Sequence, residues 1–145
     1  MSVFLFYNFL MRKFEILPHT ADLRIKLTSD NLIELFLAGI EGIAEILKPK
    51  ACKSQELALV KKISISSGDQ TTLLVDFLSE IITISQTEKM VICSAIIKKM
   101  TKTELEADLF GTKVNNFEED IKAVTYHEAN IIKNKEDNYE TPVVF

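Results

Sequence analysis

Residues 13–27 read Lys13-Phe14-Glu15-Ile16-Leu17-Pro18-His19-Thr20-Ala21-Asp22-Leu23-Arg24-Ile25-Lys26-Leu27. In this stretch, two short segments of alternating apolar and polar residues flank a Pro-His-Thr-Ala-Asp corner. After the corner, Leu23, Ile25 and Leu27 alternate with polar residues, which is the period of a half-buried strand. Because Pro18 cannot donate a ladder hydrogen bond, we expect the pairing to loosen there and to leave His19 and Asp22 at the rim of a sheet. A ligand or a partner can reach side chains in such a place.

Two amphipathic helices are predicted downstream of this stretch. Asn31 and Glu34 approximate a capping box, and apolar residues then recur at helical spacing until Lys48-Pro49 ends the pattern. A second helix is predicted to begin near residues 69–71, because apolar side chains recur at the same spacing over residues 73–82. Both apolar stripes are interpreted as faces that pack on a sheet.

The remaining segments are predicted to be strands. Residues 57–65 are strand-like, and three further runs with a period of two follow at 91–100, 105–110 and 121–133, with a short apolar tail at 141–145. The resulting order is strand, helix, strand, helix and then several strands. This order predicts an α+β fold, a two-layer sandwich with two helices packed on one face of a mainly antiparallel sheet.

The length of the chain and its N-terminal segment indicate how the chain is organised into domains. A chain of 145 residues is of the usual size for one domain, so we expect a single domain over residues 12–145, preceded by an apolar N-terminal extension at 1–11. The apolar run at residues 3–11 has no basic residue before it, and it is shorter than half of the roughly 20 residues that span a bilayer. A cytoplasmic protein is therefore expected. An alternative is that Met11 is the working start of the chain.

The cysteine content and the net charge favour some classes of protein over others. Cys52 and Cys93 form no Cys-x-x-Cys spacing, and both are interpreted as free thiols in a reducing compartment, with Cys93 packed in an apolar run. The formal charge of −4 argues against strong sequence-independent binding of nucleic acid, which depends on Lys and Arg neutralising phosphates. If RNA is involved, a partner protein would hold most of it.

Few residues in the sequence suggest a catalytic or metal-binding role. The two histidines are His19, three residues before Asp22, and His127, within the segment 122–128. A period of two would place Thr125 and His127 on one face of a strand. Either histidine can equally be a structural residue that satisfies a turn or a sheet. The sequence contains no Gly-rich phosphate loop, zinc-protease helix or nucleophile elbow. Asp22, with a few additional oxygens, could at most hold a hard cation.

Three blocks of this sequence resemble the signature blocks of the archease family. They are Phe14-Glu15-Ile16-Leu17-Pro18-His19-Thr20-Ala21-Asp22-Leu23, the helical stretch 73–82, and Lys122-Ala123-Val124-Thr125-Tyr126-His127, in the same order and at similar separations. The likeness covers about residues 12–145. The first and third blocks together are much more specific than either block alone.

The resemblance implies a non-enzymatic activator of an RtcB-type RNA ligase, which joins tRNA halves after intron removal. Proteins of this family are understood to promote guanylylation of the ligase by GTP and to restore the ligase for further turnovers. The likeness also implies a divalent cation, calcium, magnesium or manganese, held by Asp22 together with an aspartate and a carbonyl at the extreme C-terminus. This sequence stops at Phe145 without that aspartate. Either the terminal carboxylate of Phe145 substitutes as a ligand, or the affinity for the metal is reduced, or the given chain is truncated.

Three interpretations of the sequence stay open. The favoured one is an activator that binds its partner through His19, Lys122, Thr125 and His127, with tRNA reached only indirectly through the ligase. The second is a metal-dependent phosphoester hydrolase in which Asp22 and His19 bind the ion and His127 or Glu128 acts as a base. The third is a structural or chaperone-like adaptor that needs no metal. Turnover of a phosphoester by the isolated protein separates the second from the first.

Overall fold

Two helices and two antiparallel sheets make up the part of the chain that the computed structural model describes, residues 11–17, 23–53 and 56–145. The helices are α1 (Leu32–Leu47) and α2 (Gln70–Glu88). One sheet has the strand order β1-β2-β7-β6 and the other the order β3-β5-β4. The strands are β1 (Arg12–Leu17), β2 (Arg24–Ser29), β3 (Ala58–Ser66), β4 (Met90–Met100), β5 (Glu104–Lys113), β6 (Ile132–Lys133) and β7 (Tyr139–Val144). The predicted α+β class is confirmed, although the strands divide between two sheets.

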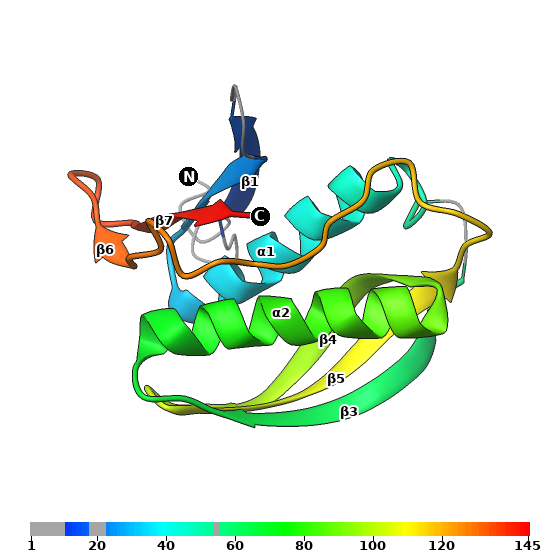
Figure 1. Ribbon diagram of the computed structural model, residues 1–145. Helices are drawn as coiled ribbons and strands as arrows, with labels where there is room; N and C mark the ends of the chain where they lie inside the picture. Colours follow the sequence, from blue (N-terminus) through cyan, green and yellow to red (C-terminus); the bar gives the residue numbers. More distant parts are fainter. Residues whose placement is uncertain (1–10, 18–22, 54–55) are drawn as a thin grey trace, which may run out of the picture.

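Each helix packs against one or both of these sheets. In Figure 1, α2 lies across one face of the β3-β5-β4 sheet, and α1 lies between α2 and the strands near the N-terminus. Phe36 of α1 and Phe77 of α2 meet with ring centroids 5.7 Å apart, and both side chains are fully buried. Apolar side chains from both helices and both sheets thus share one core. Within the described ranges, neither helix is long and apolar enough to cross a membrane.

The helix boundaries follow from local capping. The side chain of Asn31 accepts a hydrogen bond from the backbone N–H of Glu34 at 2.9 Å, which confirms Asn31 as the N-cap of α1. The Glu34 carboxylate binds Arg12 of β1 instead of completing the predicted box. Asp69 caps α2 by accepting from the N–H of Thr72 at 2.8 Å. The first helix therefore begins and ends where the sequence places it.

The stretch at residues 13–27 contributes a β-hairpin. β1 pairs with β2 in a register that sets Ile16 opposite Ile25, and β2 pairs on its other side with β7. Ile25 and Leu27 are fully buried, whereas Arg24 and Lys26, which alternate with them, are partly exposed. The predicted alternation is confirmed. The corner residues 18–22, which include His19 and Asp22, lie outside the described residues.

The prediction of a strand at residues 121–133 is wrong. Most of this segment is irregular, with a single bridge between Thr125 and Val144 and the short strand β6 at its end. Side chains satisfy several of its backbone groups: Gln86 donates to the carbonyl of Ile121 at 2.5 Å, and the N–H of Asn130 donates to the Thr141 hydroxyl at 2.9 Å. Because these groups have partners outside a ladder, the segment can run along the helices, as the gold and orange trace in Figure 1 shows.

The prediction of two free thiols is also wrong. A disulfide joins Cys52, in the turn after α1, to Cys93 of β4, and their Cα atoms are 5.7 Å apart. The two residues are 41 positions apart in the sequence. Only the packing of α1 against β4 brings them within bonding distance, so no spacing in the sequence could indicate the pair.

Candidate functional site

Three segments that are far apart in the sequence meet at the end of the β2–β7 pair. The N–H of Phe145 donates to the carbonyl of Leu23 at 2.9 Å, and the N–H of Thr125 donates to the carbonyl of Val144 at 2.8 Å. Leu23 is the residue that follows Asp22 in the sequence. We call Leu23, Thr125, Val144 and Phe145 the terminal junction. It brings together the segments that contain the first and third resemblance blocks.

Beside the terminal junction, an ion pair joins the two residues that directly follow the first and third blocks. Both terminal nitrogens of Arg24 contact the Glu128 carboxylate, at 3.1 and 2.8 Å, in a bidentate arrangement. Glu128 has a φ of 64°, in the left-handed region that side-chain-bearing residues seldom adopt. Nε2 of His127 lies 3.4 Å from the same carboxylate. The Arg24 guanidinium therefore fixes the turn at 125–128 on β2 by a geometry that a lysine could not reproduce.

A second contact fixes the same turn on α2. The Tyr126 hydroxyl donates to Oδ1 of Asp76, and the Ser67 hydroxyl donates to Oδ2 of the same carboxylate at 2.5 Å. The hydrogen bond to Asp76, followed by partial desolvation, raises the pKa of Tyr126 above the usual tyrosine value. Tyr126 nevertheless keeps 60% of its surface exposed. The turn at 125–128 is thus fixed to both β2 and α2, while much of the Tyr126 side chain stays accessible to solvent.

The predicted partner-binding residues of the third block occupy different environments. Thr125 is half-buried and pairs with β7, whereas Lys122 is exposed and has no ion-pair or hydrogen-bond partner among the described residues. The His127 side chain is 72% exposed. Because the segment is not a regular strand, the prediction that Thr125 and His127 share a strand face is wrong. His19 cannot be placed, because it lies outside the described ranges.

Sequence reasoning missed the contacts that Arg24, Glu128 and Asp76 make at this site. Asp76 accepts a hydrogen bond from Tyr126, 50 positions away. Arg24 and Glu128 are separated by 104 positions. Partners this far apart leave no periodic pattern in the sequence. The one available indication was the position of Arg24 and Glu128, each directly after a block that was already singled out.

A metal can be assessed only in part, because Asp22 lies outside the described ranges. Within those ranges, no group of three or more His, Cys, Asp and Glu side chains is placed to hold a metal ion. The Glu128 carboxylate is occupied by Arg24. The predicted ligand that the structure describes is Phe145, half-buried and fixed by its N–H on Leu23. Metal binding therefore depends on Asp22 and enters below only as a proposal.

Known proteins resemble this chain over nearly its whole length. The model of the Archease protein family (MTH1598/TM1083) matches residues 14–145. The protein archease of Pyrococcus abyssi is 30% identical over 131 residues, which covers 85% of this chain and 90% of that protein. The protein archease of Methanosarcina acetivorans is 26% identical over 141 residues, covering 92% and 94%.

Two solved structures share the fold. The solution structure of Methanobacterium thermoautotrophicum protein 1598 superposes with a TM-score of 0.72 at 24% identity and covers 91% of this chain and 96% of that one. The crystal structure of an archease, possible chaperone, from Thermotoga maritima gives a TM-score of 0.60 at 22% identity and covers 93% and 96%. These likenesses define an α+β protein of the same fold. The family match spans most of the chain, so the chain belongs to the archease family.

Proposed function

We propose that this chain is a non-catalytic activator of an RtcB-type RNA ligase in cytoplasmic tRNA splicing. It promotes guanylylation of the ligase by GTP and restores the ligase for further turnovers. Family membership supports the proposal. The observation that carries it is the terminal junction, where Phe145 bonds to Leu23 and Thr125 bonds to Val144. Segments of the first and third blocks thereby lie beside each other, as one surface for one partner requires.

A divalent cation is part of this proposal. Asp22 and an oxygen of Phe145 are its proposed ligands, and calcium, magnesium and manganese all favour oxygen donors of this kind. A bound ion would supply positive charge next to the partner. The position of Phe145, bonded to the residue that follows Asp22, supports this pairing of ligands. The residues of the chain then bind and orient, and the ligase carries out the chemistry.

The partner-binding surface comprises His19, Lys122, Thr125 and His127. Lys122 and His127 are exposed, so they can contact another protein without rearrangement of the core. Thr125 contributes by fixing the backbone of this turn on β7. The net charge of −4 supports contact with tRNA only through the ligase.

The test is to follow formation of the ligase–GMP adduct. An RtcB-type ligase is mixed with GTP and manganese, with and without this chain, and the adduct is quantified over time. We expect the chain to accelerate adduct formation. Lys122→Ala should reduce the acceleration, whereas Lys135→Ala, at another exposed lysine outside the blocks, should not. A rate no greater than with ligase alone would contradict the proposal.

The alternative hydrolase function predicts a different result. A metal-dependent phosphoester hydrolase using Asp22, His19 and His127 would turn over a chromogenic phosphoester in the presence of manganese without any ligase. The proposed activator shows no turnover under those conditions. Turnover that is lost in Asp22→Ala would replace the activator proposal with the hydrolase.

A further inference from the structure

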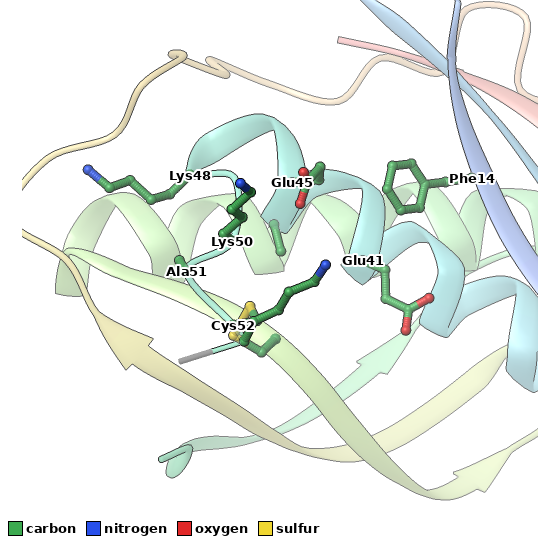
Figure 2. Close-up of a pocket in the computed structure, with 10 residues that line it drawn as sticks. Phe14, Glu41, Glu45, Lys48, Lys50, Ala51 and Cys52 are labelled. Carbon is green, nitrogen blue, oxygen red and sulfur yellow. A yellow bond between two sulfur atoms is a disulfide. The ribbon is translucent and has the colours of Figure 1, made fainter. Parts of the chain in front are cut away.

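The Cys52–Cys93 disulfide lies at the edge of the core and forms part of the wall of a pocket. The pocket has a volume of about 220 Å³ and lies between α1, the turn at 48–53 and β4. Figure 2 shows Glu41 and Glu45 on α1 and Lys50 and Cys52 on the turn that follows, with the disulfide bond in yellow. Both sulfur-bearing residues line the pocket. A small molecule that enters it therefore reaches the disulfide directly.

The two cysteines differ in how accessible they are. Cys93, on β4, is buried with 9% of its surface exposed, whereas Cys52, on the turn, is half-buried. Thiol–disulfide exchange depends on which sulfur an incoming thiolate can approach. Access therefore favours attack on Cys52, with Cys93 as the leaving group.

The charged residues around the pocket favour a particular kind of thiol. Glu41 already accepts two hydrogen bonds from Arg12, at 3.0 and 2.9 Å, and the Lys48 ammonium donates to Asn116 at 2.8 Å. Among the described residues, the side chains of Lys50, Lys53 and Glu45 have no ion-pair partner. The pocket thus offers two ammonium groups and one carboxylate beside the disulfide. A thiol with two carboxylates and one ammonium complements them.

We propose that Cys52 is a site of reversible modification by an anionic low-molecular-weight thiol of the glutathione type. The thiolate attacks Sγ of Cys52, a new S–S bond forms, and the Cys52–Cys93 bond breaks with its electron pair moving to Sγ of Cys93, which then takes a proton. A second thiol attacks the sulfur of the added group. That step releases Cys52 as a thiol and the modifier as its own disulfide.

The modification would detach the turn at 48–53 from β4. In the turn, the N–H of Ala51 donates to the carbonyl of Lys48 at 3.1 Å, and the N–H of Lys53 donates to that of Lys50 at 3.2 Å. Lys50 has a φ of 68°, which is costly for a residue with a side chain. Disulfides in reducing compartments are usually transient and redox-sensing. A disulfide that is accessible from a charged pocket and anchors a strained turn suits that role.

The test uses the full oxidised chain. It is incubated with reduced glutathione or, in parallel, with cysteamine, a cationic thiol, at equal thiolate concentrations, quenched with acid and mapped by peptide mass spectrometry. We expect the glutathione adduct on Cys52 with Cys93 as a free thiol, formed several-fold faster than the cysteamine adduct. In Lys50→Gln/Lys53→Gln the two rates should converge. In the matched control Lys61→Gln/Lys135→Gln, where both lysines are exposed and lie outside the pocket, the difference should persist.

Four results would overturn this assignment. They are a glutathione adduct on Cys93, equal rates for the two thiols in the unmodified chain, reaction only after denaturant is added, and two free thiols that resist oxidation by diamide. None of these results depends on the ligase. The assignment and the proposed activator function can therefore fail independently.

Discussion

The backbone N–H of Phe145 donates to the carbonyl of Leu23 at 2.9 Å, one pair beyond the Arg24–Val144 pair that ends the β2–β7 register. This bond places Phe145 beside the residue that follows Asp22 in the sequence. The Thr125–Val144 bridge adds the third block on the other side of β7. A surface built from both blocks is therefore a property of the strand order and not of any single motif.

Replacing Asp22 should abolish metal binding. Asp22 supplies a carboxylate to the proposed site, so Asp22→Ala removes an oxygen ligand of the kind that calcium and manganese favour. Isothermal titration calorimetry of the unmodified chain should show heat of binding, and the variant should show none.

Asp120→Asn is the control for this titration, because Asp120 is exposed and lies outside the proposed ligand set. It should bind metal like the unmodified chain. Equal heats for Asp22→Ala and the unmodified chain would remove Asp22 from the proposed site.

Arg12→Ala should destabilise the fold. Arg12 of β1 pairs with Glu34 and Glu41 of α1, and hydrogen bonding to Glu41 above all, and then to Glu34, raises the pKa of the guanidinium. The Glu34 side chain is only 7% exposed, so loss of its partner leaves a nearly buried carboxylate unpaired. Because Arg12 itself is about one third exposed, we expect a loss of about 2 kcal/mol in the free energy of unfolding, less than for a fully buried pair.

Urea denaturation measures this loss. Arg12→Lys should be milder than Arg12→Ala, because a lysine keeps the charge but cannot bind Glu41 in a bidentate way. A change below about 0.5 kcal/mol in Arg12→Ala would show that solvent screens the pair almost completely.

Tyr126 should titrate above the usual tyrosine range. Its hydrogen bond to Asp76 raises the pKa of Tyr126 from the model-compound value of 10.0. A group whose pKa is raised by folding stabilises the fold fully below its unfolded pKa, and that stabilisation disappears as the pH rises through the folded pKa. The contribution of Tyr126 is therefore present at neutral pH and is lost in the alkaline range above pH 10.

Ultraviolet difference titration of the phenolates tests this expectation. The unmodified chain should show a late phenolate transition that is absent in Tyr126→Phe. In Asp76→Asn, the Tyr126 transition should move to lower pH. A titration of Tyr126 that Asp76→Asn leaves unchanged would mean that the hydrogen bond is not maintained in solution.

The disulfide should stabilise the fold substantially. A cross-link that closes a loop of 41 residues restricts the unfolded chain, and the loop-entropy relation gives about 4 kcal/mol for this length. Thermal unfolding of the Cys52→Ser/Cys93→Ser variant should therefore occur well below that of the oxidised chain. Dithiothreitol should lower the stability of the unmodified chain but not that of the variant. Equal unfolding midpoints for oxidised and reduced chains would contradict the expected effect.

The sequence was most informative where local chemistry decides the structure. The Asn31 cap, the apolar stripes of α1 and α2, and the alternation of Ile25 and Leu27 depend on neighbours within a few residues, and all were predicted. The α+β class follows from the order of these elements.

Prediction failed where partners far apart in the sequence decide the outcome. Residues 121–133 alternate like a strand, but β7 has only six residues. Its second edge pairs with Thr125 at one end and with β6 at the other, and the turn between them bonds to side chains instead. The Cys52–Cys93 disulfide and the Arg24–Glu128 pair likewise exist only because packing brings their members together.

The most direct test of the central claim compares ligase–GMP formation with the unmodified chain, Asp22→Ala and Asp120→Asn under identical concentrations of GTP and manganese. We predict that the unmodified chain and Asp120→Asn accelerate adduct formation equally and that Asp22→Ala leaves the rate at that of the ligase alone. Full acceleration by a correctly folded Asp22→Ala would contradict the account.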